Sequence, residues 1–176
     1  ISAQHIIVGA PNIYLDAAYP GGEFRKSMME DWLTANQFNP TSLKIWRMHP
    51  TFDAYWRGMD ISDKYPKVNY PAVHIGGWFD IFAQGTINAF LGYQTQGGPK
   101  ARGKQKLVMG PWTHGVFQDK AGELTFPNAN NPPIHYNDAL QWFAHYLKGI
   151  DNGVDKEPAV AYYVMGDVSD PSAPGN

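Results

Sequence analysis

The sequence contains no cysteine among its 176 residues. This absence excludes disulfide bonds, thiolate zinc sites and a cysteine nucleophile, but it does not indicate a compartment, because oxidising and reducing locations both tolerate a cysteine-free chain. The sequence also lacks an excess of charge of either sign, since 14 Lys and Arg residues oppose 16 Asp and Glu residues. We therefore expect neither a nucleic acid nor an anionic membrane surface as a partner.

Long apolar runs are also missing. No stretch approaches the roughly 18 consecutive apolar residues of a membrane-spanning helix, and the first residues lack the basic and then apolar pattern of a signal peptide. Apolar residues nevertheless make up 43% of the chain and aromatic residues 14%. This composition excludes a disordered chain and predicts one folded domain, or a piece of a larger one, with a large core or an aromatic-lined pocket.

The two ends of the sequence suggest a segment of a longer protein. The first residue is not Met, and a strand-like run begins almost at once, at residues 4–8. The last eight residues, 169–176, are rich in Ser, Pro and Gly, which is typical of a linker.

Strand and helix patterns alternate along the chain. Short apolar runs predict strands at residues 4–8, 72–77, 106–109 and 159–165. Helical spacing predicts helices within residues 23–36, 85–93 and 139–149, and a short helix that Thr51 could cap. In the helix at 139–149 the apolar face is expected to consist of Leu140, Phe143, Ala144 and Leu147. This order predicts an α/β fold with βαβ units and a mostly parallel sheet.

Two polar side chains follow predicted strands where a parallel sheet places its ligand sites. Asp80 comes after the strand at 72–77, and His114 comes after the strand at 106–109. Neighbouring strands would bring the two residues to one rim, as the acid and the base of a nucleophilic triad. Two plainer interpretations stay open: Asp80 as a helix cap or turn residue, and His114 as a structural loop histidine.

The other five histidines, His5, His49, His74, His135 and His145, have no metal-ligand spacing, and we interpret them as structural or surface residues. No metal site is expected. The nucleophile is missing as well, because none of the six serines lies in the G-x-S-x-G turn that presents a catalytic serine. A complete serine hydrolase cannot be assembled from these residues.

Five sequence strings occur together in one order: YPGGEFR (19–25), HPTFDAYWR (49–57), the stretch 71–80 ending in GGWFD, KLVMGPWTHG (106–115), and LKG followed by YYVMGD. In this combination the chain resembles the acyl-esterase family that includes bacterial cocaine esterase, the α-amino-acid ester hydrolases and the Xaa-Pro dipeptidyl-peptidases. The resemblance covers most of the chain.

The resemblance implies a partial α/β-hydrolase fold with an inserted helical cap. Residues 1–19 would be a core strand and loop, 20–66 part of the cap, 67–166 the C-terminal part of the core, and 167–176 a linker towards a missing jelly-roll domain. Asp80 and His114 fall on the family's triad acid and base. The serine and the oxyanion-hole tyrosine would come from a missing N-terminal part of the protein, and no cofactor is implied.

The resemblance implies a small ester or amide as the substrate. Aromatic residues near the implied triad indicate which acyl group the pocket could bind. In the α-amino-acid ester hydrolases, a carboxylate pair looks to lie two and three residues after the triad acid, where it binds the positively charged amino group of the substrate. Here Phe82 and Ala83 occupy those positions. An apolar side chain cannot pair with an ammonium group, so Phe82 is expected either to contact an apolar acyl group or to pack beneath the loop. Trp112 is a second candidate for the pocket wall, whereas Trp78 is expected to support its loop.

Two rival functions stay open at this stage. A Xaa-Pro dipeptidyl-peptidase would need an acidic or polar anchor for the substrate's amino terminus, and this segment displays none. A catalytically inactive module could instead use the aromatic pocket only to bind ligands. An intact serine in the upstream part would argue for the enzyme, and a replaced serine would argue for the binding module.

Overall fold

The computed structural model describes residues 2–166, and its centre is a parallel sheet of four strands in the order β1-β2-β3-β6. The strands are β1 (Gln4–Ile7), β2 (Ala72–Gly77), β3 (Gln105–Gly110) and β6 (Val160–Tyr162), and every neighbouring pair is parallel. The predicted α/β class with a mostly parallel sheet is therefore confirmed. The last predicted segment, residues 167–176, lies outside the described residues.

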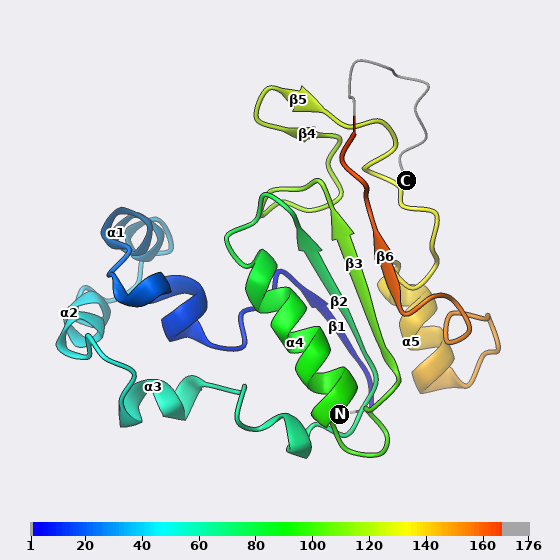
Figure 1. Cartoon of the computed structure of the whole chain (residues 1–176), viewed down its shortest axis with the longest axis horizontal. Helices are drawn as coiled ribbons and strands as arrows, with labels where there is room; N and C mark the ends of the chain where they lie inside the picture. The colour runs from blue at the N-terminus through cyan, green and yellow to red at the C-terminus, as the bar shows by residue number, and fades with distance from the viewer. Residues whose placement is uncertain (1, 167–176) are drawn as a thin grey trace.

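Strands β2 and β3 form the centre of the sheet, and every residue in both strands is buried. Helix α4 (Ala83–Gln96) covers one face, where Phe90 packs against Leu107 and Met109. Helix α5 (Ala139–Lys148) lies on the opposite face (Figure 1). Alternate residues of each strand therefore face different helices, which explains why most residues of the two strands are apolar or Gly.

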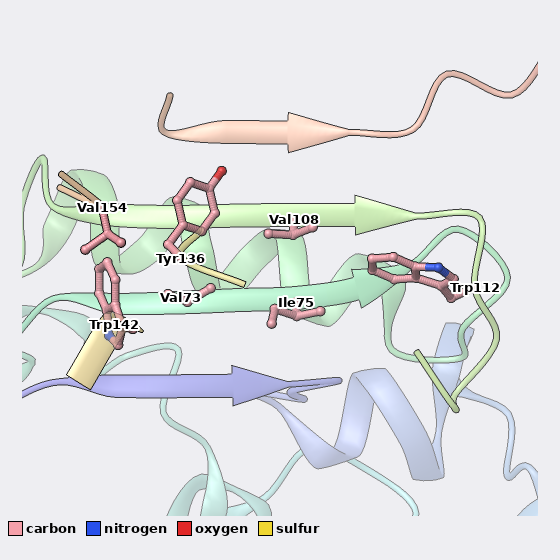
Figure 2. Packing of buried hydrophobic residues seen from close by; sticks show 7 residues of the cluster. All are labelled: Val73, Ile75, Val108, Trp112, Tyr136, Trp142 and Val154. Atoms are coloured by element: carbon pink, nitrogen blue, oxygen red, sulfur yellow. The ribbon is translucent and has the colours of Figure 1, made fainter. Parts of the chain in front are cut away.

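The face under α5 holds the largest cluster of buried apolar residues: Val73, Ile75, Val108, Trp112, Tyr136, Trp142 and Val154. Figure 2 shows Trp142 and Tyr136 lying over the two central strands, with Trp112 beyond the carboxyl end of β2. The predicted inward face of α5 was right only in part, because Phe143 packs against this cluster but the two leucines do not. Leu140 and Leu147 are 78% and 58% exposed, whereas Trp142 is fully buried. One large aromatic ring fills the space over the strands better than the leucine stripe, and it decides which side of the helix turns inward.

Between β1 and β2 the chain forms a layer of short helices beside the sheet (Figure 1). It comprises η1 (Tyr14–Ala18), η2 (Pro20–Gly22), α1 (Lys26–Ala35), α2 (Thr41–Met48), α3 (Ala54–Met59) and η3 (Tyr65–Lys67). Its buried residues form a second core, which we call the cap cluster: Tyr14, Ala17, Ala18, Tyr19, Met29 and Trp56. Residues 14–19 thus pack with the segment that we predicted as the cap.

The start of α3 differs from the prediction. Asp53, rather than Thr51, caps this helix, because its Oδ1 accepts a hydrogen bond from the backbone N–H of Tyr55 at 3.0 Å. Helix α2 was not predicted as an element of its own, since Asn39 and Pro40 suggested only a break. Pro40 instead precedes the first turn of α2, where a missing N–H costs nothing.

A small antiparallel hairpin of β4 (Lys120–Ala121) and β5 (Leu124–Thr125) lies between β3 and α5 in the chain. It stands beyond the carboxyl ends of the sheet strands (Figure 1). Among the described residues, no helix combines the length and the apolarity needed to cross a bilayer.

His74 makes stability depend on pH. Its side chain is fully buried in β2 against the rings of Phe90 and Tyr93, and its only hydrogen-bond partner is Gln105, at 3.3 Å. Burial disfavours the charged ring and lowers the pKa of His74 to about 4. The folded state therefore binds fewer protons than the unfolded state, so stability is complete above the unfolded pKa of 6.5 and falls as pH drops towards 4.

We expect the free energy of unfolding to fall by about 3 kcal/mol between pH 7 and pH 4 because of this one group. Urea denaturation of the protein and of a His74→Gln variant at several pH values would isolate the effect. The variant should lose less stability over that interval. Equal losses in the two proteins would contradict the assignment.

Candidate active site

The loops that follow β2 and β3 are joined by backbone hydrogen bonds that continue the strand pairing. The N–H of Trp78 donates to Gly110 O at 2.8 Å, and the N–H of Phe79 donates to Trp112 O at 3.0 Å. This close approach depends on Gly77, because a Cβ at that position would lie 2.1 Å from the carbonyl oxygen of Trp112. A residue with a side chain would push the two loops apart.

Asp80 and His114 meet at this edge of the sheet, as the order of the strands predicts. Nδ1 of His114 lies 2.7 Å from Oδ2 of Asp80. The Asp80 carboxylate is fully buried, while the His114 side chain is 58% exposed. A carboxylate only accepts hydrogen bonds, so the proton of a neutral His114 ring lies on Nδ1, and Nε2 is left as a base.

The second oxygen of Asp80 is also used. Oδ1 accepts the backbone N–H of Phe82 at 2.6 Å, in the turn that leads into α4. Asp80 is thus a turn residue and the partner of His114 at once, which unites two interpretations that the sequence leaves as alternatives. The turn fixes the carboxylate, so its free oxygen faces His114 with little freedom to move.

A cavity of about 310 Å³ opens beside His114. We call it the His114 cavity; besides His114 it is lined by apolar residues from the segment after β1, the cap helices and the turn before α4: Val8, Ile13, Ala17, Met28, Met29, Trp32, Trp46, Ile81 and Phe82. Phe82 contacts the imidazole ring directly, with ring centroids 5.5 Å apart and planes at 75°. Apart from His114, the described residues that line this cavity include no ionisable side chain and no serine.

The two tryptophans near the site support the structure. Trp112 is 1% exposed in the core under α5, and its Nε1 donates to Ala129 O at 2.9 Å. It does not line the His114 cavity, so we assign it a packing role in place of the predicted substrate contact. Trp78 packs with Phe90, Leu107 and Met109, and its Nε1 donates to Tyr163 O at 3.0 Å, which links the Asp80 loop to the chain after β6.

A second histidine–aspartate pair lies in the cap, and the sequence alone did not reveal it. Nδ1 of His49 lies 2.6 Å from Oδ2 of Asp53, and Tyr55 stacks on the imidazole with ring centroids 4.4 Å apart. The hydrogen bond from His49 lowers the pKa of Asp53. Because Asp53 also caps α3 and neither residue lines the His114 cavity, this pair fixes a helix end. The i, i+4 spacing was the signal that could have predicted it.

The remaining histidines lie away from the cavity. His5 donates from Nε2 to Asn137 O at 3.1 Å, and burial lowers its pKa. His74 is buried in β2, and His135 is paired with Glu157 at the surface.

One group of side chains could hold a metal ion by geometry alone. Ligand atoms of His145, Asp151 and Asp155 lie within 4.8 Å of one another at the end of α5. Both aspartates are exposed, and the ammonium group of Lys156 already pairs with Asp151 at 3.3 Å. We assign these residues to a surface ion-pair cluster.

The geometry beside the His114 cavity is suited to an acid and a general base, and no nucleophilic side chain is among the described lining residues. A buried carboxylate orients an imidazole, the second ring nitrogen is free, and an apolar cavity lies beside it. This arrangement can take a proton from a hydroxyl group and return it to a leaving group.

Comparisons with known proteins give the family context. The model of the X-Pro dipeptidyl-peptidase (S15 family) matches residues 11–116. The chain is 25% identical over 120 residues to cocaine esterase from Rhodococcus sp. (strain MB1 Bresler), an alignment that covers 67% of this chain and 20% of that protein. It is 31% identical over 115 residues to a Mycobacterium tuberculosis protein named as a candidate serine esterase, with 63% of this chain and 15% of that protein covered.

A solved structure shares the fold. The crystal structure of a CocE/NonD family hydrolase from Staphylococcus aureus superposes with a TM-score of 0.69 and 18% sequence identity, over 94% of this chain and 28% of that one. The chain therefore spans a small part of the length of each relative, at most 20% of the two curated proteins.

Proposed function

Because the chain belongs to the X-Pro dipeptidyl-peptidase (S15) family of hydrolases, we propose that it supplies the acid and the general base of a serine esterase. The observation that carries the proposal is the 2.7 Å contact between Asp80 and His114 at the edge of an apolar cavity. Asp80 would hold the imidazole with Nε2 available, and it would stabilise the imidazolium that forms during the reaction.

In the proposed mechanism, Nε2 of His114 takes the proton of a serine hydroxyl as the serine oxygen attacks the carbonyl carbon of an ester. The resulting tetrahedral intermediate collapses when His114 returns the proton to the leaving alcohol, and an acyl-enzyme remains. A water molecule then gives a proton to the same nitrogen and attacks the acyl group. The acid is released, and the serine regains its proton.

The serine is proposed to come from sequence that precedes these residues in the complete protein. None of the serines in the chain lies in a G-x-S-x-G turn, and no serine lines the described His114 cavity. Residues 1–176 by themselves are therefore expected to be inactive, since the acid and base cannot form the acyl-enzyme.

The test is a fluorophosphonate probe, which labels only an activated serine. Applied to the complete polypeptide that contains this chain, the probe should add its mass to one serine and abolish hydrolysis of a p-nitrophenyl ester. A protein that hydrolyses the ester without taking up the probe would refute the serine mechanism. A protein that neither hydrolyses the ester nor takes up the probe would refute the proposal and favour the inactive ligand-binding module.

The acyl group of the substrate is proposed to be apolar and uncharged. Phe82 and its neighbours line the cavity, and among its described lining residues there is no carboxylate that could pair with an ammonium group. An unpaired charge moved from water into such a cavity loses its hydration. The same reason argues against the peptidase alternative, because a dipeptidyl-peptidase must anchor the amino terminus of its substrate.

We expect the kcat/KM for p-nitrophenyl butyrate to exceed that for its 2-amino analogue by at least about tenfold at pH 6, where the amine is charged. Steady-state assays with both esters would measure the ratio. A Phe82→Glu variant, which adds a carboxylate to the cavity, should narrow it. A wild-type protein that prefers the amino ester would contradict this substrate assignment.

A further inference from the structure

We propose that Phe82 is a positioning residue, which holds the His114 ring in its catalytic orientation and connects it to the cap cluster. This inference rests on the proposed function. It gives Phe82 a role in catalysis with every substrate, including those too small to fill the His114 cavity.

His114 has few restraints of its own. Its side chain is 58% exposed, and among residues 2–166 its one hydrogen bond joins Nδ1 to Asp80. A single hydrogen bond fixes the position of Nδ1, but the ring can still turn about that contact, and such a turn swings Nε2 away from the nucleophile. A misplaced base loses much of the advantage of proximity.

Phe82 supplies the missing restraint. Its ring meets the imidazole at 75°, with centroids 5.5 Å apart, which is a favourable arrangement for two aromatic rings. A rotated imidazole would lose this contact. The preferred orientation of His114 is therefore set from two directions, by the Asp80 carboxylate at one nitrogen and by the Phe82 ring at the side.

Phe82 is well suited to this role because it is itself held firmly. Its N–H donates to Oδ1 of Asp80 at 2.6 Å, and its carbonyl oxygen accepts the N–H of Thr86 at 2.8 Å. Its side chain packs against the cap cluster, which includes Met29 and Trp56. The same residue therefore joins the acid, the base and the cap, so a shift of the cap would reach His114 through the Phe82 ring.

The experiment compares p-nitrophenyl acetate with p-nitrophenyl benzoate in the complete polypeptide. In a Phe82→Leu variant, we expect kcat for the acetyl ester to fall about three- to tenfold with little change in KM, because an acetyl group is too small to depend on the cavity wall. The Nδ1–H proton of His114 should also broaden in the NMR spectrum. A Phe82→Tyr variant, which keeps a ring, should restore most of kcat.

Two further proteins serve as controls. Phe90→Leu makes the same substitution within α4, the helix that follows Phe82, at a buried position in another cluster that does not touch His114. It should lower the melting temperature but leave kcat for the acetyl ester unchanged. Phe82→Met keeps an apolar side chain of similar reach without a ring. If the leucine variant does not fold, Phe82→Met takes its place, and its kcat for the acetyl ester should fall by about the same three- to tenfold.

The outcomes separate the two proposals. If only the benzoyl ester is affected in the Phe82 variants, Phe82 is a substrate contact and the positioning role is refuted. If kcat for acetate falls equally in Phe90→Leu, the loss reflects general destabilisation, and the positioning role is again refuted. If Asp80 and His114 variants keep full activity while the wild type hydrolyses esters, the proposed function fails before Phe82 becomes relevant.

Discussion

Replacing His114 by alanine is expected to lower kcat for ester hydrolysis by about 10⁴-fold in the complete polypeptide, with little loss of stability. The reason is that no other described base lines the cavity, while the side chain removed is more than half exposed. Steady-state assays with p-nitrophenyl butyrate, paired with thermal melting, would measure the two effects separately.

Asp80→Asn should reduce kcat to a similar extent, because an amide at this position no longer favours the ring tautomer with its proton on Nδ1. His135→Ala is a matched control: His135 is a surface histidine paired with Glu157, away from the His114 cavity. Its kcat should equal that of the wild type. An active His114→Ala protein, or an equal loss in the His135 variant, would exclude the assigned pair.

Gly77→Ala is expected to have the largest effect on stability. The added Cβ would lie 2.1 Å from Trp112 O and 2.6 Å from its carbonyl carbon, and both are backbone atoms that cannot rotate away. The loops after β2 and β3 must then separate, which costs at least about 3 kcal/mol of unfolding free energy. Since these loops carry Asp80 and His114, esterase activity should fall as well. Chemical denaturation and the ester assay would test both results.

Gly58 is the matched glycine for this experiment. It lies at an exposed position of helix α3, and a Cβ at this position would meet nothing within 4 Å. Gly58→Ala should stabilise the protein slightly, by up to about 1 kcal/mol, because alanine is the better helix former. If Gly77→Ala proved as harmless as Gly58→Ala, the close approach of the two loops would not be essential.

Local patterns were enough to predict the four strands of the parallel sheet and their order along the chain, but not the β4–β5 hairpin or helix α2. The run at 72–77 matches β2 residue for residue, because a strand buried on both faces is mostly apolar, with His74 as the buried polar exception. Gly149 ends α5 in the left-handed conformation, as its place after Lys148 predicts. The positions of Asp80 and His114 after two strands followed from the same patterns.

Packing between distant segments could not be predicted in this way. The leucines of α5 suggested an inward face, yet Trp142 occupies the space over β2 and β3. Trp112 looked like a pocket residue because it lies two positions before His114, but its ring turns into the core. Each result depends on which side chain fits a space formed by several elements, and no spacing along one element records that fit.

By itself the sequence determined the α/β class, the order of the four sheet strands along the chain, and the positions of Asp80 and His114 after two of those strands, because these depend on periodicity and on residue type. Only the tertiary structure decided that β2 and β3 are neighbours, that Asp80 and His114 lie 2.7 Å apart, and that cap helices complete an apolar cavity beside them. Those features join residues far apart in the chain, and their geometry is set by packing rather than by local preference.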